Sequence, residues 1–235
     1  MALAPESLQH ILQTVAPYTM VSPTAITFTI EQMLAAIDAG LPGSLVECGV
    51  WKGGCSFAML LAQRAVYGAV RRPVYLLDSF EGLPPAEQRD GPLALAWQSR
   101  QMPEIFFDNC LAPLNEVRQT LIRLGFSPAE ARVVPGWFHE TVPALVSELS
   151  DTAIACLRLD GDWYSSTRIC LEHLLPLVAE GAPVLVDDYY AWDGCARAVH
   201  DYLAEHDLPY RIKSFPDLGG AYFYKRAYRN SVTIL

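Results

Sequence analysis

The feature that most constrains this chain is a repeated alternation of short apolar runs with longer segments whose apolar residues recur at helical spacing. The short runs have the length and composition of buried strands. They are expected at 44–49, 73–78, 132–135, 153–160 and 182–187. Strands that alternate with helices form a mostly parallel sheet covered on both faces, and ligands bind outside the carboxyl ends of such strands.

Helices are expected between these strands and before the first one, at 6–15, 24–39, 57–70, 115–124, 141–149, 167–179 and 195–206. An antiparallel strand pair at 210–215 and 221–225 should close the sheet around Gly219-Gly220. Residues 82–113 are rich in Pro, Gly and polar residues and predict a long loop over one face. Loops of that length are usually functional or mobile. No repeat or linker indicates a second domain.

The composition narrows the class of protein. With 235 residues, 51% of them hydrophobic and 18% charged, the chain is long enough for one sizeable core and is not disordered. The net charge of −9 and the absence of a Lys/Arg-rich run argue against nucleic acid or an anionic membrane as the main partner. No targeting segment and no run of 18 apolar residues is found, so a cytoplasmic protein is expected. The six cysteines lack metal or disulfide spacing and predict reduced core thiols.

A glycine-rich turn follows the first predicted strand, in Glu47-Cys-Gly-Val-Trp-Lys-Gly-Gly54. Glycines at a strand-to-helix turn let the backbone approach a ligand closely, although the same pattern also forms simple tight turns. Asp78 ends the second strand, 31 positions after Glu47, where a carboxylate can accept two hydrogen bonds from a ribose diol. Ser79 to Gly82 would form the wall beside it. The combination predicts a nucleoside-containing cofactor.

Acidic residues gather at the ends of the fourth and fifth predicted strands, in Asp160-Gly-Asp162 and Asp187-Asp188. Carboxylates that share a small volume need a cation between them. Oxygen ligands without His or Cys favour Mg²⁺, with Ca²⁺ or Mn²⁺ as alternatives. The competing interpretation is that these residues cap the following helices, which explains one carboxylate per helix but not several at adjacent strand ends.

Aromatic residues follow the third strand in Gly136-Trp-Phe-His139. Trp137 or Phe138 can stack on an adenine or can serve as ordinary core or lid aromatics. His139 is the only histidine at a predicted strand end.

These motifs together resemble the macrocin O-methyltransferase family (the TylF, MycF and NovP type), whose members use S-adenosylmethionine and Mg²⁺. The resemblance covers most of the chain and rests on segments in the family's order: 18–20, 43–54, 77–84, 136–143, 159–167 and 186–189. It implies a class I methyltransferase fold, a doubly wound seven-stranded sheet of Rossmann-like type. It also implies an N-terminal helical cap over 1–40, a single catalytic unit over 41–235 and a homo-oligomer, to which the apolar face of 24–39 could contribute.

Carried over to this sequence, the resemblance implies that Thr19 and Met20 close over the cofactor. The cofactor's other contacts would be Glu47, Gly49, Val50, Trp51, Asp78, Ser79, Gly82, Gly136, Trp137, Phe138 and Asp160. Mg²⁺ would be held by Asp160, Asp187 and Asp188, with Asp160 also the candidate general base. Asp162, Tyr164 and His139 are candidate acceptor contacts. Departures such as Lys52, where the family more often has Arg, touch no proposed ligand and put only the acceptor in doubt.

The leading hypothesis is Mg²⁺-dependent O-methylation of a hydroxyl of a vicinal diol, on a sugar of a secondary metabolite. A catechol-type phenol is an alternative acceptor, because it chelates Mg²⁺ in the same way. From another class, Asp160-Gly-Asp162 also fits the Asp-x-Asp motif of a metal-dependent glycosyltransferase, although no basic cluster for a diphosphate accompanies it. A non-catalytic cofactor-binding protein would not need the acidic cluster.

Overall fold

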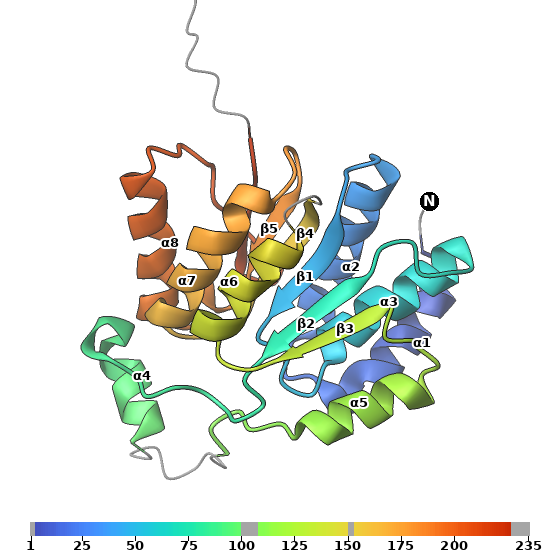
Figure 1. Cartoon of the computed structure of the whole chain (residues 1–235), viewed down its shortest axis with the longest axis horizontal. Coiled ribbons are helices and arrows are strands. Elements are labelled where there is room, and N and C mark those ends of the chain that lie inside the picture. Colours follow the sequence, from blue (N-terminus) through green and yellow to red (C-terminus); the bar gives the residue numbers. More distant parts are fainter. Residues whose placement is uncertain (1–2, 100–107, 150–152, 227–235) are drawn as a thin grey trace, which may run out of the picture.

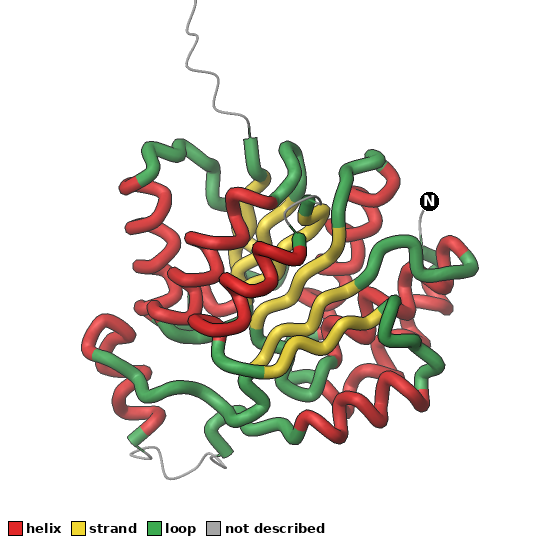
Figure 2. The backbone as a smooth tube through the Cα atoms, in the orientation of Figure 1, coloured by secondary structure: helices red, strands yellow, loops and turns green. Residues whose placement is uncertain are grey.

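The seven predicted strands form one sheet in the order β3-β2-β1-β4-β5-β7-β6 (Figures 1 and 2). The computed structural model describes residues 3–99, 108–149 and 153–226. The strands are β1 (Ser44–Cys48), β2 (Val74–Asp78), β3 (Ala131–Pro135), β4 (Ile154–Leu159), β5 (Pro183–Val186), β6 (Lys213–Ser214) and β7 (Ala221–Tyr224). The first five are parallel, and β7 runs antiparallel to β5 and β6. The predicted α/β class and the mostly parallel sheet are confirmed, and the strand order reverses between β1 and β4.

Helices cover both faces of this sheet (Figure 1). They are α1 (Pro5–Val15), α2 (Pro23–Asp38), α3 (Gly54–Tyr67), α4 (Gly91–Gln98), α5 (Leu114–Arg123), α6 (Phe138–Glu148), α7 (Tyr164–Leu174) and α8 (Asp193–Glu205). Side chains alternate along each strand, so Leu45 and Leu185 pack against α1, α2, α3 and α5, whereas Val46 and Val184 pack against α6, α7 and α8. The result is three layers with two apolar cores.

Helix α2 belongs to the first of these cores. Its buried residues include Phe28, Ile30 and Met33, and it packs against α3, β4 and β5. The apolar face that was considered for oligomer contacts is therefore used within the chain. No single described helix is long and apolar enough to cross a membrane, and α1 with its following turn meets those criteria only together with α2, across a bend of 119°.

The prediction of a long loop over 82–113 is wrong in part, because residues 91–98 form α4. Pro92 stands in the first turn of this helix, where proline is favoured, and Leu-Ala-Leu-Ala favours helix after it. Residues 100–107 lie outside the described part of the chain. The indole of Trp97 lies edge-on to those of Trp163 and Trp192, at centroid distances of 6.1 and 5.8 Å, and this contact ties α4 to the starts of α7 and α8.

Three helices begin earlier than the apolar spacing predicted. Helices α3, α6 and α7 start at Gly54, Phe138 and Tyr164, each within a few residues of the preceding strand end. Their starts carry glycines and aromatic residues in place of Ser, Thr or Asp caps, which hid them from the sequence signals. At the C-terminal edge, β6 is limited to Lys213–Ser214 within the predicted 210–215.

We expect Met33→Ala in α2 to lower the free energy of unfolding by about 2–5 kcal/mol, because the Met33 side chain is fully buried and its loss leaves a cavity. Ile122→Ala on α5 is the control, since that side chain is 73% exposed and its loss should cost less than about 0.5 kcal/mol. Urea denaturation measures both. Equal, small effects would mean that α2 is not part of the cooperative core.

Candidate active site

The carboxyl ends of the parallel strands open into a cavity of about 530 Å³. Most residues selected from the sequence line it, namely Thr19, Met20, Glu47, Gly49, Val50, Trp51, Asp78, Ser79, Gly82, Trp137, Phe138, His139, Asp160, Asp162, Asp187 and Asp188. The cavity is therefore lined by the glycine turn and Asp78 together with the acidic strand ends. This is the volume of a small-molecule site.

Two selected residues are not among those that line the cavity. The backbone N–H of Gly136 donates to the carbonyl oxygen of Asp78 at 2.9 Å and so shapes the turn after β3. The hydroxyl of Tyr164 donates to Asp201 on α8 at 3.0 Å. Sequence reasoning also missed several lining residues, which are Val21, Cys55, Leu83, Pro84, Pro85, Cys110, Gly161, Ser165, Ser166 and Ile169. Some of these lie inside the motifs quoted above, whereas nothing in the sequence marks Cys110.

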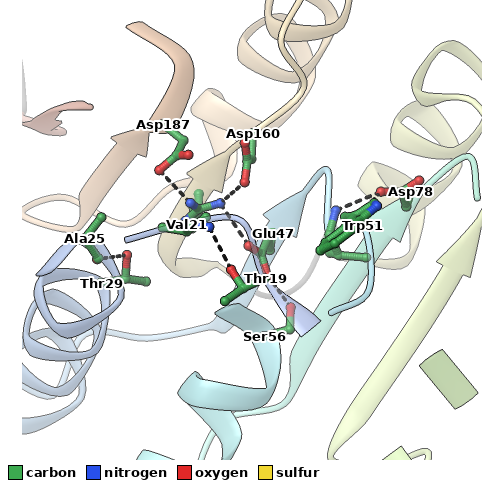
Figure 3. A network of polar contacts seen from close by, with 12 residues as sticks. Thr19, Val21, Ala25, Thr29, Glu47, Trp51, Ser56, Asp78, Asp160 and Asp187 are labelled. Carbon is green, nitrogen blue, oxygen red and sulfur yellow. Dashed lines mark hydrogen bonds and ion pairs between the residues drawn. The ribbon is translucent and has the colours of Figure 1, made fainter. Parts of the chain in front are cut away.

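Asp78 organises the glycine turn. Its Oδ2 accepts hydrogen bonds from the backbone N–H groups of Val50 and Trp51 at 2.8 and 2.9 Å, and Figure 3 shows the contact with Trp51. Its Oδ1 accepts a hydrogen bond from the backbone N–H of Phe80 at 2.8 Å. Burial raises the pKa of this carboxyl, and the three backbone donors oppose that effect. Asp78 thus fixes the backbone at the place where the sequence predicts a cofactor.

Gly49 allows the ends of β1 and β4 to meet. Its φ of +88° is left-handed, and a Cβ added there would lie 1.6 Å from the carbonyl oxygen of Asp160. Only glycine fits this approach without moving one strand end. The glycine turn and the acidic cluster are therefore joined through backbone contact.

A buried cation that the sequence analysis did not single out lies beneath the acidic cluster. Arg158 on β4 is fully buried, and its Nη1 lies 3.0 Å from Oε1 of Glu47 and 2.5 Å from Oδ2 of Asp160. Its Nη2 lies 2.6 Å from Oδ1 of Asp187. In Figure 3 the carboxylates of Asp160 and Asp187 lie above Glu47, and a dashed line joins each to the nitrogen atoms between them. The available signal was a charged residue inside an otherwise apolar strand.

The predicted approach of the fourth and fifth strand ends is confirmed. Asp160, Asp187 and Asp188 each offer an oxygen, and these oxygens lie within 4.8 Å of one another. Asp188 is additionally held by the backbone N–H of Asp162, which donates to its Oδ2 at 2.9 Å. The Asp162 carboxylate in turn accepts a hydrogen bond from Nε1 of Trp192 at 2.8 Å. Asp162 therefore supports Asp188 from the side.

The charges of this cluster are not balanced. Arg158 contributes one positive charge, whereas the cluster contains the five carboxyl groups of Glu47, Asp160, Asp162, Asp187 and Asp188. Burial raises the pKa of Glu47 and Asp187 to about 7, although the Arg158 charge opposes it. Burial, followed by repulsion from neighbouring carboxylates, raises the pKa of Asp162 to about 8 and raises that of Asp188 strongly. A cluster that holds protons at neutral pH can accept a further cation in their place, and its oxygen-only donors fit Mg²⁺.

Comparison with known proteins identifies the family. The profile described as macrocin O-methyltransferase (TylF) matches residues 13–225. The chain belongs to the macrocin O-methyltransferase family.

The chain is 37% identical over 195 residues to a tetracenomycin 4′-O-methyltransferase of Streptomyces olivaceus, named for an 8-demethyl-8-(2,3-dimethoxy-α-L-rhamnosyl) substrate. This match covers 83% of the chain and 69% of the relative. It is also 32% identical to mycinamicin III 3″-O-methyltransferase of Micromonospora griseorubida, covering 89% of the chain and 79% of the relative.

Solved structures agree with this family assignment. The O-methyltransferase NovP superposes with a TM-score of 0.76 at 30% identity, covering 89% of this chain and 82% of NovP. The calicheamicin methyltransferase CalS11 has a TM-score of 0.67 at 21% identity, with 95% and 94% coverage, and supports the fold. The predicted class I methyltransferase fold is confirmed, and this member of the macrocin O-methyltransferase family is an O-methyltransferase.

We expect Gly49→Ala to destabilise the protein and to abolish the thermal shift caused by S-adenosylhomocysteine, because the added methyl group collides with the Asp160 backbone. Gly68→Ala is the matched control. Gly68 also has a positive φ, +75°, but a Cβ there meets nothing within 4 Å, so the cost should be the left-handed strain of about 1–2 kcal/mol alone. If both variants behave alike, the close approach at Gly49 has no role in the site.

The raised pKa values predict how stability depends on pH. Between the ordinary values of 3.8–4.5 and the folded values of about 7–8, the folded protein holds protons that the unfolded chain has released. The free energy of unfolding without divalent cations should therefore fall as pH rises from 5 to 8. Asp162→Asn should flatten this slope, since it removes one titrating group. Urea titrations in EDTA test this, and an equally steep slope in Asp162→Asn would contradict it.

Proposed function

We propose that this protein transfers a methyl group from S-adenosylmethionine to a hydroxyl of a vicinal diol, with Mg²⁺ bound at Asp160, Asp187 and Asp188. The observation that carries the proposal is a cavity lined both by the three-carboxylate cluster and by the glycine turn that Asp78 holds. We further propose that the acceptor hydroxyl lies on a sugar of a natural product.

The cofactor is proposed to lie along the β1 and β2 ends. The backbone from Gly49 to Trp51 would face its methionine part, the remaining lone pairs of Asp78 would accept from its ribose, and Trp137 and Phe138 would lie by its adenine. When bound, S-adenosylmethionine supplies an electrophilic methyl group on a sulfonium. Thr19 and Met20 reach the cavity from the N-terminal segment, and the 66% exposed side chain of Met20 places it at the rim.

The acidic cluster is proposed to prepare the acceptor oxygen. A divalent cation bound there would hold both oxygens of a diol and lower the pKa of one of them. Asp160 stands next to the cavity and can accept the proton of that hydroxyl. The glycine turn and the acidic cluster, held together at Gly49, can then keep the oxygen about 3–3.5 Å from the methyl carbon, the distance that in-line displacement requires.

The names of the relatives support a sugar acceptor. The relative from S. olivaceus is named as the 4′-O-methyltransferase of a rhamnosyl-tetracenomycin, and the relative from M. griseorubida as mycinamicin III 3″-O-methyltransferase. A catechol-type acceptor would use the same cluster, and no contact in the described residues favours it. The glycosyltransferase alternative is not supported, since the family is one of methyltransferases. A homo-oligomer and a cap formed by residues 1–40 stay predictions.

We expect Asp160→Asn and Asp188→Asn each to abolish turnover of a glycosylated acceptor, since each removes a proposed ligand. The affinity for S-adenosylhomocysteine, measured by calorimetry, should change by less than about tenfold, or about 1.4 kcal/mol. EDTA should also stop turnover by the unaltered enzyme, and Mg²⁺ should restore it.

Two outcomes would contradict the proposal. Turnover that continues in EDTA would remove the metal from the reaction. Loss of S-adenosylhomocysteine binding in both variants would mean that the acidic cluster supports the cofactor site and not the acceptor. A parallel assay with a simple catechol separates the two acceptor classes.

A further inference from the structure

Arg158 is placed by strand register and alternation. It stands opposite Glu47 in the pairing of β1 with β4, and opposite Leu185 in the pairing of β4 with β5. Side chains two residues apart share a face of the sheet, so Asp160 and Asp187 follow on the same side as Arg158 and Leu185. The guanidinium is thus enclosed between three strand ends, and Arg158 is fully buried.

Arg158 contacts one oxygen atom of the Asp160 carboxylate and one oxygen atom of the Asp187 carboxylate. Its Nη1 contacts Oδ2 of Asp160, and its Nη2 contacts Oδ1 of Asp187. Two nitrogen atoms of one planar group therefore hold two carboxylates at a fixed separation, while the second oxygen of each carboxylate is left for another partner. The planar guanidinium fixes the separation of its two nitrogen atoms, whereas a lysine offers one ammonium on a flexible stem and sets no such separation.

We propose that Arg158 is a positioning residue for the cation site, which holds Asp160 and Asp187 so that their second oxygens stay together with Asp188. The inference rests on the proposed function in one respect, because it takes these three residues as cation ligands. It adds that the guanidinium of Arg158 sets the geometry of the site. Glu47 in turn helps to fix the position of this guanidinium from the side of the proposed cofactor, through its contact with Nη1 at 3.0 Å.

A purely structural role explains the arrangement less well. Burying an ion pair carries a desolvation cost that often cancels its attraction, and apolar residues of similar volume stabilise such a position as well or better. The other side chains of β4 are apolar, and Arg158 interrupts them one residue before the strand ends. Glu47 is also held from its far side, where its Oε2 accepts a hydrogen bond from the hydroxyl of Ser56. The network is thus anchored at both ends.

The test is the affinity of the cofactor-free and acceptor-free protein for Mn²⁺, measured by the electron paramagnetic resonance signal of free Mn²⁺. Arg158→Lys keeps the charge but removes the fork, and we expect Mn²⁺ binding to weaken by about 10-fold to 100-fold, as for other residues that orient metal ligands. Arg168→Lys is the matched control. Arg168 pairs with Glu172 and Glu205 away from the cavity, so its variant should bind Mn²⁺ as the unaltered protein does.

Glu47→Gln keeps the inference testable if Arg158→Lys does not fold. This substitution is nearly isosteric and removes none of the three proposed cation ligands. It removes the charge that competes for Nη1, so that Nη1 pairs more strongly with the Asp160 carboxylate. Mn²⁺ binding should then weaken by about threefold or more, a change of at least about 0.6 kcal/mol. The Mn²⁺ spectrum of the bound ion should also change, which a defect in folding stability alone would not cause.

The outcomes distinguish a failure of the Arg158 inference from a failure of the proposed metal site. If the unaltered protein binds Mn²⁺ but Arg158→Lys and Glu47→Gln bind it within twofold of that affinity, Arg158 has no positioning role and the inference is overturned. If the unaltered protein binds no Mn²⁺ at millimolar concentration, the metal part of the proposed function fails and the inference fails with it. Weakened binding in both variants with an unchanged Arg168→Lys supports the inference.

Discussion

The interaction on which the site depends is the bridge from Arg158 to three carboxylates on three adjacent strands. Glu47, Asp160 and Asp187 come from the ends of β1, β4 and β5, and each lies within 3.0 Å of the same guanidinium. Without a buried cation these strand ends would place like charges against one another in a low dielectric. The bridge therefore allows the central strands to end at one edge with their acidic residues facing the cavity.

This bridge changes the interpretation of the acidic cluster. Several carboxylates at one strand edge require a cation, and Arg158 already supplies one. What then favours a second cation is the remaining excess of carboxyl groups and the pKa of Asp162 and Asp188, which burial and mutual repulsion raise. The metal hypothesis thus rests on a charge balance and a ligand geometry, and no longer on the crowding of acids alone.

Much of the architecture could be predicted because its signals are local. Apolar runs such as that of β4 predict buried parallel strands. The order of the motifs along the chain predicts that the glycine turn and the acidic residues lie at one edge of the sheet. The misses have physical reasons. Helix α4 has local helix signals within a stretch otherwise rich in Pro, Gly and polar residues, and its place is set by contacts of Trp97 with residues far along the chain. Cys110 reaches the cavity from a loop. Arg158 was missed because its partners become visible only once the strand order is known.

The backbone contact at Gly49 and the bridge at Arg158 together explain how one fold edge can serve two ligands. Gly49 brings the glycine turn against the carbonyl oxygen of Asp160, and Arg158 links the side chain of Asp160 to Glu47 at the start of the same turn. A shift at either strand end must therefore move both halves of the site. Because methyl transfer needs the acceptor oxygen and the methyl carbon aligned, a rigid connection between β1 and β4 would serve the proposed reaction by limiting their relative motion.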